Sequence, residues 1–218
     1  MGKTILTPNQ QLLLDQIANN KILTKNYYLT GGTALSEFYL QHRLSEDLDF
    51  FSENELVETD IATWVQTTTK TLRTKVAFET LQGQLIYYFS FPNDTVMVDF
   101  AYFPFPVLGK YKKYKQLRIA SIEDIAANKL QAILTRSRGR DYFDIYEIIK
   151  QNKSSIEQMR KGYQLKFDVY IPDEQLARRL TAVLDTKDQP KFLQTVNWKT
   201  IEQFFLTEAK KLQKKIII

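Results

Sequence analysis

Two spacings of hydrophobic residues follow one another along this chain and divide it into two regions. Up to about residue 105, short alternating or continuous apolar runs predict β-strands, and longer segments with apolar positions three or four apart predict helices. The strands are predicted at 27–30, 47–51, 75–80, 84–91 and 95–102, and the helices at 8–21, 33–40 and 59–73. Beyond this region helical spacing continues almost alone, at 121–135, 142–149, 154–164, 173–186 and 199–215.

This order of elements predicts an α+β protein with two domains, a sheet-containing domain over residues 1–106 and a helical region over residues 107–218. Pro104 and Pro106 favour an end of the sheet there, because proline cannot donate a hydrogen bond to a neighbouring strand. At the helix starts, Thr7 before Pro8 is a candidate N-cap, and Thr59 or Asp60 is a candidate cap for the helix at 59–73.

Composition excludes several classes of site. The 218 residues include no cysteine, which excludes a disulfide scaffold, a thiolate zinc site and a cysteine nucleophile. No apolar stretch of about 18 residues occurs, so we expect no membrane partner. The first residues show neither the apolar segment nor the cleavage site of a secretory signal, so we expect a cytoplasmic protein.

The basic residues are unevenly distributed. Lysine and arginine number 30 against 25 aspartates and glutamates, which gives a net charge of +5. The segment 110–118 carries five cations with Tyr111 and Tyr114 between them, and three arginines follow at 136, 138 and 140. Such a segment can contact a nucleic-acid backbone and stack bases, and a solvated loop explains it equally well.

The most informative local feature is a pair of acids, Asp47 and Asp49, within a predicted strand. Side chains two residues apart on a strand lie on one face, where two carboxylates repel each other unless a cation lies between them. Oxygen ligands of this kind suit Mg²⁺ or Mn²⁺. Asp99 is a candidate third ligand and catalytic acid, because a charge inside the apolar run 96–100 is costly to bury without a partner. The alternative to metal binding is that these acids lie at strand ends and face solvent or lysines.

A second candidate element precedes this pair. Gly31, Gly32 and Thr33 separate a strand from a helix, where glycines and free backbone amides can bind phosphate. A tight turn capped by Thr33 is the simpler alternative. Arg43 is a candidate phosphate contact or a surface partner of Glu46. Ser45 is a further candidate for nucleotide binding and can equally be a cap.

Four strings together resemble the AbiEii/AbiGii-type nucleotidyltransferases, toxins of abortive-infection and toxin–antitoxin systems with relatives in the MenT group. They are GGTAL at 31–35, RLSEDLDF at 43–50, SIEDIAANKL at 121–130 and RGRDYFD at 138–144. The resemblance covers roughly residues 25–150, and it shows no specific signature in the last third of the chain.

The resemblance implies a DNA polymerase β-like nucleotidyltransferase core with a mixed sheet, followed by a helical C-terminal region. It implies that Gly31, Gly32 and Thr33 hold phosphate and that Asp47 and Asp49 bind Mg²⁺ or Mn²⁺. It also implies that Lys129 contacts the triphosphate of an NTP substrate and that Asp141 is an essential acid. From the residues alone, Lys129 can be a solvated helix lysine. Asp141 can cap its helix or pair with Arg138 or Arg140.

The function expected from these residues is transfer of a nucleotide from an NTP to an acceptor, with RNA or tRNA implied as acceptor and an antitoxin protein as partner. Alternatives are a protein or small-molecule hydroxyl as acceptor, and a nucleotide- or nucleic-acid-binding module without turnover. A metal-dependent phosphohydrolase is least favoured, because it normally uses histidine ligands and His42 is the only histidine. We expect His42 to be a surface or packing residue.

Overall fold

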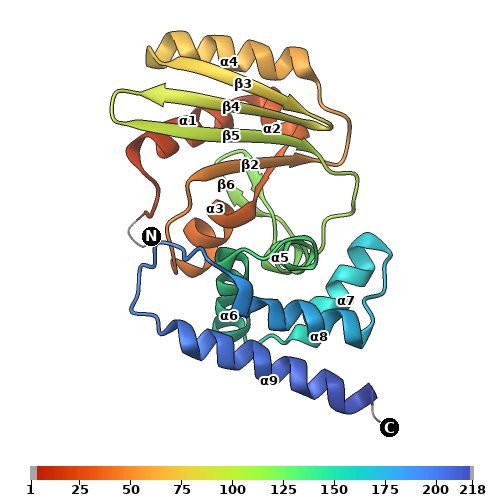
Figure 1. The fold of residues 1–218 in the computed structure, drawn as a ribbon. Coiled ribbons are helices and arrows are strands. Elements are labelled where there is room, and N and C mark those ends of the chain that lie inside the picture. Colours follow the sequence, from red (N-terminus) through yellow and green to blue (C-terminus); the bar gives the residue numbers. More distant parts are fainter. Residues whose placement is uncertain (1–3, 217–218) are drawn as a thin grey trace. The chain divides into compact units, whose positions relative to one another are not determined.

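The computed structural model describes residues 4–216, and they divide into two compact units (Figure 1). The sheet unit consists of the chain up to Tyr39, Ser45–Pro106 and Lys110–Ser121, and the helical unit consists of Leu40–Leu44, Val107–Gly109 and the chain from Ile122 onward. Each unit is therefore assembled from separate stretches of sequence. None of the described helices is both long enough and apolar enough to span a lipid bilayer.

The described residues of the sheet unit form one seven-stranded mixed sheet in the order β3-β4-β5-β2-β1-β7-β6. The strands are β1 Tyr28–Thr30, β2 Asp47–Ser52, β3 Lys75–Leu81, β4 Gln84–Phe91, β5 Asp94–Tyr102, β6 Lys112–Tyr114 and β7 Leu117–Ile119. The prediction that the sheet ends at Pro104 and Pro106 is therefore wrong. β7 pairs in parallel with β1, and runs of three residues are too short for their periodicity to be recognised.

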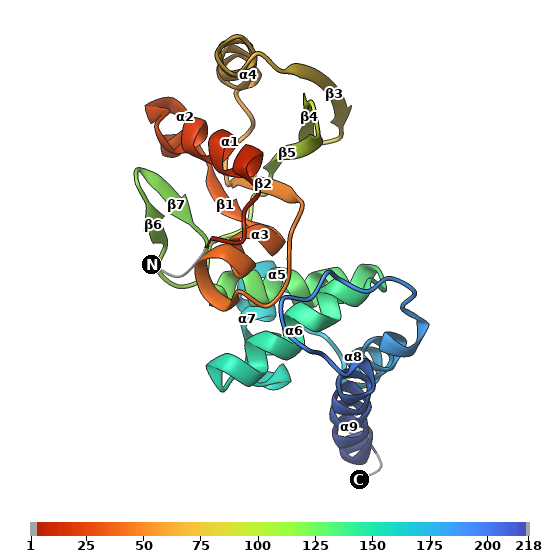
Figure 2. The same ribbon diagram turned by 90° about the vertical axis from the view of Figure 1, so that its left-hand side faces the viewer.

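Alternation along the central strands separates the sheet into an apolar and a polar face. Leu48 and Phe50 of β2 and Val98 and Phe100 of β5 are fully buried. The helices α1 Pro8–Ala18, α2 Lys21–Asn26 and α4 Glu58–Leu72 cover this apolar face (Figure 2), where Trp64 of α4 packs on Phe100 with ring centroids 5.8 Å apart.

Local capping explains some helix starts and not others. At α1, the Thr7 side chain accepts a hydrogen bond from the Gln10 amide, and the Gln10 side chain accepts one from Thr7, so the predicted cap is confirmed. The predicted cap of α4 is wrong, because its N-cap is Val57 and no side chain caps it. Acids in its first turn stabilise that end through the helix dipole instead.

A short helix links β1 to the next strand. α3 Gly31–Leu35 starts directly after β1 and continues as a π-helical turn over Ser36–Leu40. The predicted sequence of strand, glycine turn and helix is confirmed, although the helix already begins at the first glycine.

The helical unit contains the helices predicted for the second half of the chain. They are α5 Ile122–Thr135, α6 Gly139–Asn152, α7 Ile156–Phe167, α8 Asp173–Thr181 and α9 Trp198–Ile216. α6 starts three residues before the predicted 142, and the helix predicted at 173–186 ends as a 3₁₀ turn over Ala182–Asp185. α8 packs along α9 (Figure 1), and the amphipathic faces of these helices enclose their own apolar core.

Candidate functional site

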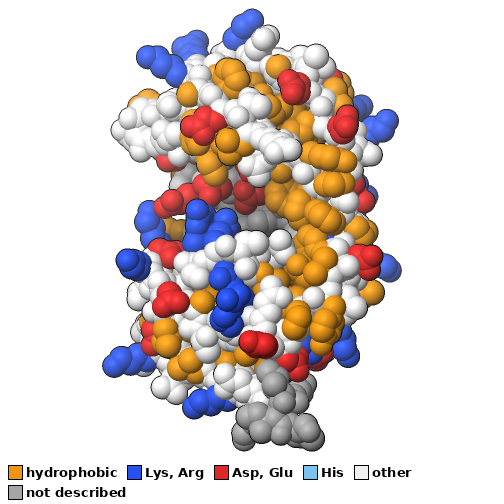
Figure 3. Space-filling view, turned by 45° about the vertical axis from the view of Figure 1, so that its right-hand side comes forward, with side chains coloured by type: hydrophobic (Ala, Val, Ile, Leu, Met, Phe, Trp, Pro, Cys, Tyr) orange, Lys and Arg blue, Asp and Glu red, His pale blue; other side chains and the backbone are white. Residues whose placement is uncertain are grey.

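Three aspartates come together on the polar face of the sheet. β2 and β5 are parallel neighbours, and their register places Asp49 directly beside Asp99 and Asp47 beside Met97. Because side chains two apart on a strand share a face, Asp47 lies on the same face as the Asp49–Asp99 pair. Figure 3 shows a row of acidic side chains on the surface of the sheet unit. The adjacent strands β2 and β5 therefore carry three carboxylates on the same face of the sheet.

Asp99 is the most deeply buried of these acids. The residue is 9% exposed, and its Oδ1 atom is buried without a hydrogen-bond partner among the described residues. Burial and the charges of Asp49 and Asp47 raise the pKa of Asp99 to about 7. A carboxylate in this state is stabilised by a proton or by a bound cation. The donor set therefore fits a divalent cation chemically.

The side chains do not form a ready-made metal cage. No group of three or more histidine, aspartate or glutamate side chains among the described residues is placed to hold a metal ion as it stands. The backbone register brings the carboxylates to one face, and as they stand their side chains do not converge on one ion. Asp47, Asp49 and Asp99 as Mg²⁺ or Mn²⁺ ligands thus stay a prediction.

Gly31 has a specific steric reason to be glycine. Its φ is +72°, and a Cβ atom built there would lie 1.9 Å from Asp49 Oδ2. The Asp49 carboxylate therefore occupies the space that any other residue at position 31 would fill. The sequence suggested that Gly31 lets a phosphate approach the backbone, and the structure adds that it leaves space for the Asp49 carboxylate.

Thr33 and Ser45 hold the backbone around β2. The buried Thr33 hydroxyl donates to the carbonyl oxygen of Asp47, which ties the first turn of α3 to the first residue of β2. The carbonyl of Ser45 accepts from Gln10 Nε2 at 2.8 Å. Both contacts fix the segment that carries Asp47 and Asp49. Phosphate or nucleotide binding by Gly31, Gly32, Thr33 and Ser45 stays a prediction.

The helical unit contains a buried ion cluster centred on Asp144. Asp144 Oδ1 lies 2.7 Å from His42 Nε2 and 2.6 Å from Arg43 Nε, and Asp144 Oδ2 lies 2.7 Å from Lys129 Nζ. A second bond joins Arg43 Nη2 to Oδ2 at 2.8 Å, so the guanidinium binds the carboxylate in bidentate fashion. Burial raises the pKa of Asp144, but the charges of Arg43 and Lys129 hold it well below its usual value.

Asp141 extends the cluster by one helical turn. Lys129 Nζ lies 2.9 Å from its Oδ1, and Arg136 Nε lies 3.0 Å from its Oδ2. Burial alone would raise the pKa of Asp141, and the charges of Lys129 and Arg136 lower it overall. Lys129 therefore bridges two ionised aspartates and is 8% exposed, so the solvated-lysine alternative is excluded.

The predicted site residues fall into two groups. Gly31, Gly32, Thr33, Ser45 and the three aspartates 47, 49 and 99 lie in the sheet unit, whereas Arg43, Lys129 and Asp141 lie in the helical unit. Arg43 is 3% exposed, and its guanidinium binds Asp144 rather than standing at the surface.

Asp144, at the centre of the buried ion cluster, was not predicted as a site residue from the sequence. The only signal for it in the sequence is that it shares a helical face with Asp141. His42 is buried beside Phe143, with ring centroids 5.2 Å apart, so the surface alternative for His42 is wrong and the packing alternative is confirmed.

Residues 12–215 match the family described as "Nucleotidyl transferase AbiEii toxin, Type IV TA system". The chain belongs to the AbiEii nucleotidyltransferase family. The AbiEii assignment covers nearly the whole chain, including the last third, in which the sequence showed no signature. This membership supports nucleotidyl transfer as the class of reaction.

One relative and two solved structures resemble this AbiEii protein over almost their full length. The uncharacterized protein aq_aa25 of Aquifex aeolicus (strain VF5) is 25% identical over 209 residues, which cover 94% of this chain and 96% of that protein. An H. pylori protein assigned as a nucleotidyltransferase has a TM-score of 0.61 at 19% identity, covering 96% of this chain and 97% of its own. JHP933 from Helicobacter pylori has a TM-score of 0.57 at 20% identity, covering 96% and 94%. The two structures show a shared fold, and the predicted α+β nucleotidyltransferase fold is confirmed.

Proposed function

We propose that this protein transfers a nucleoside monophosphate from an NTP to an acceptor hydroxyl in a reaction that requires Mg²⁺ or Mn²⁺. The observation that carries the proposal is the pairing of Asp49 with Asp99 on adjacent parallel strands, with Asp47 on the same face. The buried Oδ1 atom of Asp99 has no partner among the described residues, which supports a cation or a proton as part of the working state.

The chemistry follows from these carboxylates. Asp47, Asp49 and Asp99 would hold the metal ion, which supplies positive charge against the phosphates and lowers the pKa of the acceptor hydroxyl. In the transfer step the acceptor oxygen bonds to the α-phosphorus, and the bond from that phosphorus to pyrophosphate breaks. Asp99 is the candidate to bind that ion or to accept the hydroxyl proton, because its Oδ1 atom is buried beside Asp49 without a hydrogen-bond partner among the described residues.

We propose RNA, including tRNA, as the acceptor. Support comes from the β6–β7 hairpin, where the Arg118 guanidinium lies 4.9 Å from the centre of the Tyr111 ring and Lys110 and Lys113 are exposed. Other cations of this hairpin hold it in place: Lys112 donates to the Phe38 carbonyl at 2.6 Å, and Lys115 pairs with Asp15 at 2.6 Å. Exposed cations suit a phosphate backbone without sequence preference.

The assay uses the purified chain with each α-³²P-labelled NTP, Mg²⁺ or Mn²⁺ and total cellular RNA. The test variant is Asp49→Asn. The matched control is Asp94→Asn. Asp94 lies on the same strand as Asp99, and its carboxylate accepts hydrogen bonds from the Thr7 hydroxyl and the Asn9 amide. Label on RNA with wild type and the control variant, and none with Asp49→Asn, supports the proposal.

Other outcomes separate the alternatives. Specific NTP binding without labelled RNA leaves the site in place and moves the acceptor to a protein or a small-molecule hydroxyl. Full activity of Asp49→Asn refutes the assignment of the site. Absence of NTP binding favours a binding module without turnover.

We also propose that the transfer makes the protein the toxin of a toxin–antitoxin pair, as the family description suggests. Induced expression of wild type should then arrest bacterial growth, and Asp49→Asn expressed to the same level should not. Equal arrest by both would show that toxicity does not depend on this site.

A further inference from the structure

The sheet has two edges of different character, β3 at one end and β6 at the other. β6 is only three residues long and includes the exposed Lys112 and Lys113, and a short, lysine-bearing edge does not readily pair with another chain. β3 is seven residues long, contains no proline, and pairs with β4 in an unbroken register from Lys75 to Leu81. The edge at β3 therefore lacks the protection that a short length, a proline or a bulge gives.

β3 is open to solvent along almost its whole length. Six of its seven residues are exposed, and only Val76 is half-buried. Phe78 is 68% exposed and Leu81 is 54% exposed, so large apolar side chains stand on both faces of this strand. Exposed apolar side chains along an unprotected edge are typical of a surface that pairs with another chain.

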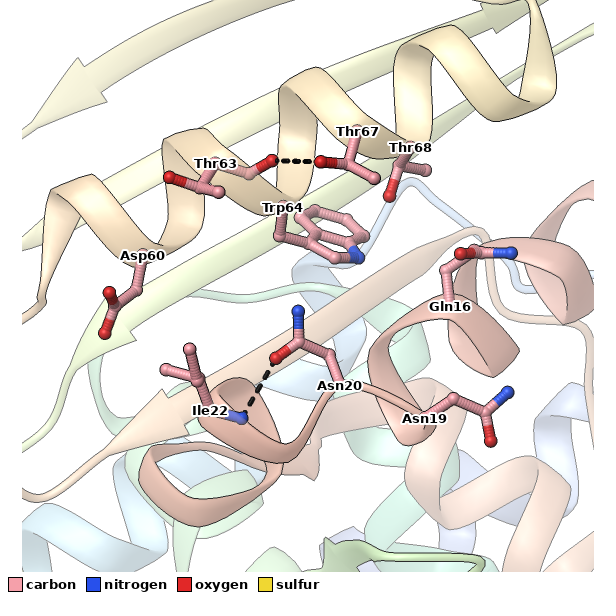
Figure 4. A pocket seen from close by; sticks show the side chains of 9 residues that line it. All are labelled: Gln16, Asn19, Asn20, Ile22, Asp60, Thr63, Trp64, Thr67 and Thr68. Atoms are coloured by element: carbon pink, nitrogen blue, oxygen red, sulfur yellow. Dashed lines mark hydrogen bonds between the residues drawn. The ribbon is translucent and has the colours of Figure 1, made fainter.

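The helix that precedes β3 leaves its outer edge open. α4 packs over β4 and β5, where the Trp64 ring lies 5.5 Å from Phe89 and 5.8 Å from Phe100, centroid to centroid. Seen along the strands in Figure 2, α4 lies over the face of the sheet and not beyond β3. In Figure 4 the Trp64 side chain points from α4 toward the corner between α1 and α2, and thus into the interior of the unit. The outer edge of β3 is accessible to a further strand.

The hairpin between β3 and β4 determines which peptide groups face outward. Its loop consists of Gln82 and Gly83, and Leu81 pairs with Gln84 across it. Residues that flank a two-residue loop exchange backbone hydrogen bonds, and such pairs alternate along an antiparallel ladder. The peptide groups of the odd-numbered residues of β3 therefore face β4. Those that face outward belong to Val76, Phe78 and Thr80.

The sequence of β3 is complementary to itself in one antiparallel register. A two-fold axis at Ala77 places Val76 opposite Phe78 of a second copy, where both residues present outward peptide groups and can exchange hydrogen bonds. The same register places Lys75 opposite Glu79 of the second copy, and the symmetry forms each pair twice. The two charged side chains lie on one face of the strand and the two apolar side chains lie on the other.

Neighbouring registers fit less well. Moving the two-fold axis by one residue in either direction places Lys75 opposite Ala77 or Leu81, where its charge has no partner. Moving the axis to Glu79 places two like charges opposite each other, which destabilises the pairing. An axis between two residues sets outward peptide groups against inward ones, so no ladder forms. Charge and hydrogen bonding together select the register centred on Ala77.

We propose that β3 is a dimerisation edge, at which two copies of this chain pair their β3 strands antiparallel about a two-fold axis at Ala77. The exposed Phe78 side chain then packs against Val76 of the other copy, and the two sheets become continuous. The occupant is a second copy because one sequence supplies both members of the Lys75–Glu79 pairs. This interface is independent of the proposed nucleotide transfer.

A single cysteine tests both the dimer and its register. The chain contains no cysteine, so Ala77→Cys introduces the only thiol. At an opposed pair that exchanges no hydrogen bonds the Cα atoms lie about 4.5 Å apart, which a disulfide spans. The matched control is Leu81→Cys on the same face, because the register places the two copies of residue 81 roughly 27 Å apart. On mild oxidation, Ala77→Cys should form a covalent dimer on a non-reducing gel and Leu81→Cys should stay monomeric.

A charge exchange tests the ion pairs without a crosslink. Sedimentation velocity of the full chain over a range of concentrations gives the dissociation constant of the dimer. Glu79→Lys turns two attractive pairs into two repulsive ones and should raise this constant about tenfold. Adding Lys75→Glu restores opposite charges and should recover the wild-type value. Both residues are exposed, and thermal unfolding of each variant checks that it is folded.

Three outcomes overturn the proposal. If the wild-type chain stays monomeric at high micromolar concentrations and Ala77→Cys forms no covalent dimer, the edge does not bind a second copy. If Leu81→Cys crosslinks as readily as Ala77→Cys, the disulfides report random collisions. If a dimer forms and keeps its dissociation constant in Glu79→Lys, it uses another surface of the protein.

Discussion

Replacing Gly31 by alanine isolates the contact between the glycine turn and Asp49. Gly31 has a φ of +72°, where an alanine costs about 1–2 kcal/mol. The new Cβ would also lie 1.9 Å from Asp49 Oδ2 and 2.8 Å from its Cγ, far inside contact distance. Forcing a methyl group into occupied space costs about 1–3 kcal/mol more. Gly31→Ala should therefore destabilise the protein by about 2–5 kcal/mol in total.

The chain provides a control with the same backbone and without the clash. Gly83 has a φ of +75°, and a Cβ there would meet its nearest neighbour, Tyr102 Cβ, at 3.9 Å, which is an ordinary contact. Gly83→Ala should cost only the backbone penalty of about 1–2 kcal/mol. The difference between the two variants then measures what the Asp49 carboxylate contributes to the requirement for glycine.

Urea unfolding and the labelled-NTP assay together read out this comparison. Asp49 can escape the clash by rotating, which would reduce the loss of stability but displace the carboxylate. Gly31→Ala should then lose nucleotidyl transfer, while Gly83→Ala keeps it. Equal stability and equal activity of the two variants would refute the inference that Asp49 needs the space over Gly31.

Three further predictions concern buried charge. Asp144→Asn removes the carboxylate that the buried Arg43 guanidinium binds and one of the two carboxylates that Lys129 bridges, so urea unfolding should show a loss of about 3–5 kcal/mol. A loss under about 1 kcal/mol would contradict the central role of Asp144. The raised pKa of Asp99 means that, without metal, its contribution to stability is complete below about pH 4 and is lost as the pH rises through about 7. Asp99→Asn should abolish this dependence between about pH 4 and 7, and an unchanged pH profile would show that another group causes it. Lys166 lies 2.5 Å from Asp124, and both are fully buried, so Lys166→Met alone should destabilise by about 3 kcal/mol. Adding Asp124→Asn should recover most of that loss in the same assay, and no recovery would mean that Lys166 acts through packing.

The parts of the fold that follow from neighbouring residues were predictable. Thr7 and Pro8 predict the start of α1 because capping involves atoms within one helical turn. The alternation of apolar residues around Asp47 and Asp49 places both acids on one face of a strand. The short strands β6 and β7 were missed because three residues contain too little pattern. Their pairing with the sheet depends on a partner strand far away in the sequence.

The site, too, was predictable only where neighbouring residues in the sequence carry the signal. Acids on β2 and β5 could be proposed as partners because each stands out against an apolar strand, and the register confirms that Asp49 and Asp99 are neighbours. The partner of Arg43 could not be found in this way, because Asp144 is 101 residues away. Local spacing suggested Glu46, and only the tertiary structure identifies which carboxylate the guanidinium binds.

The interleaving of the chain between its two units limits how the protein can be divided. A cut after residue 106, where composition changes, would leave His42 and Arg43 on one fragment and Asp144 on the other, and would remove β6 and β7 from their sheet. A fragment that starts at residue 107 would bury Asp144 without its partners His42 and Arg43. Expression of isolated halves should therefore give insoluble or unfolded products, and function from two pieces would require their reassembly during folding.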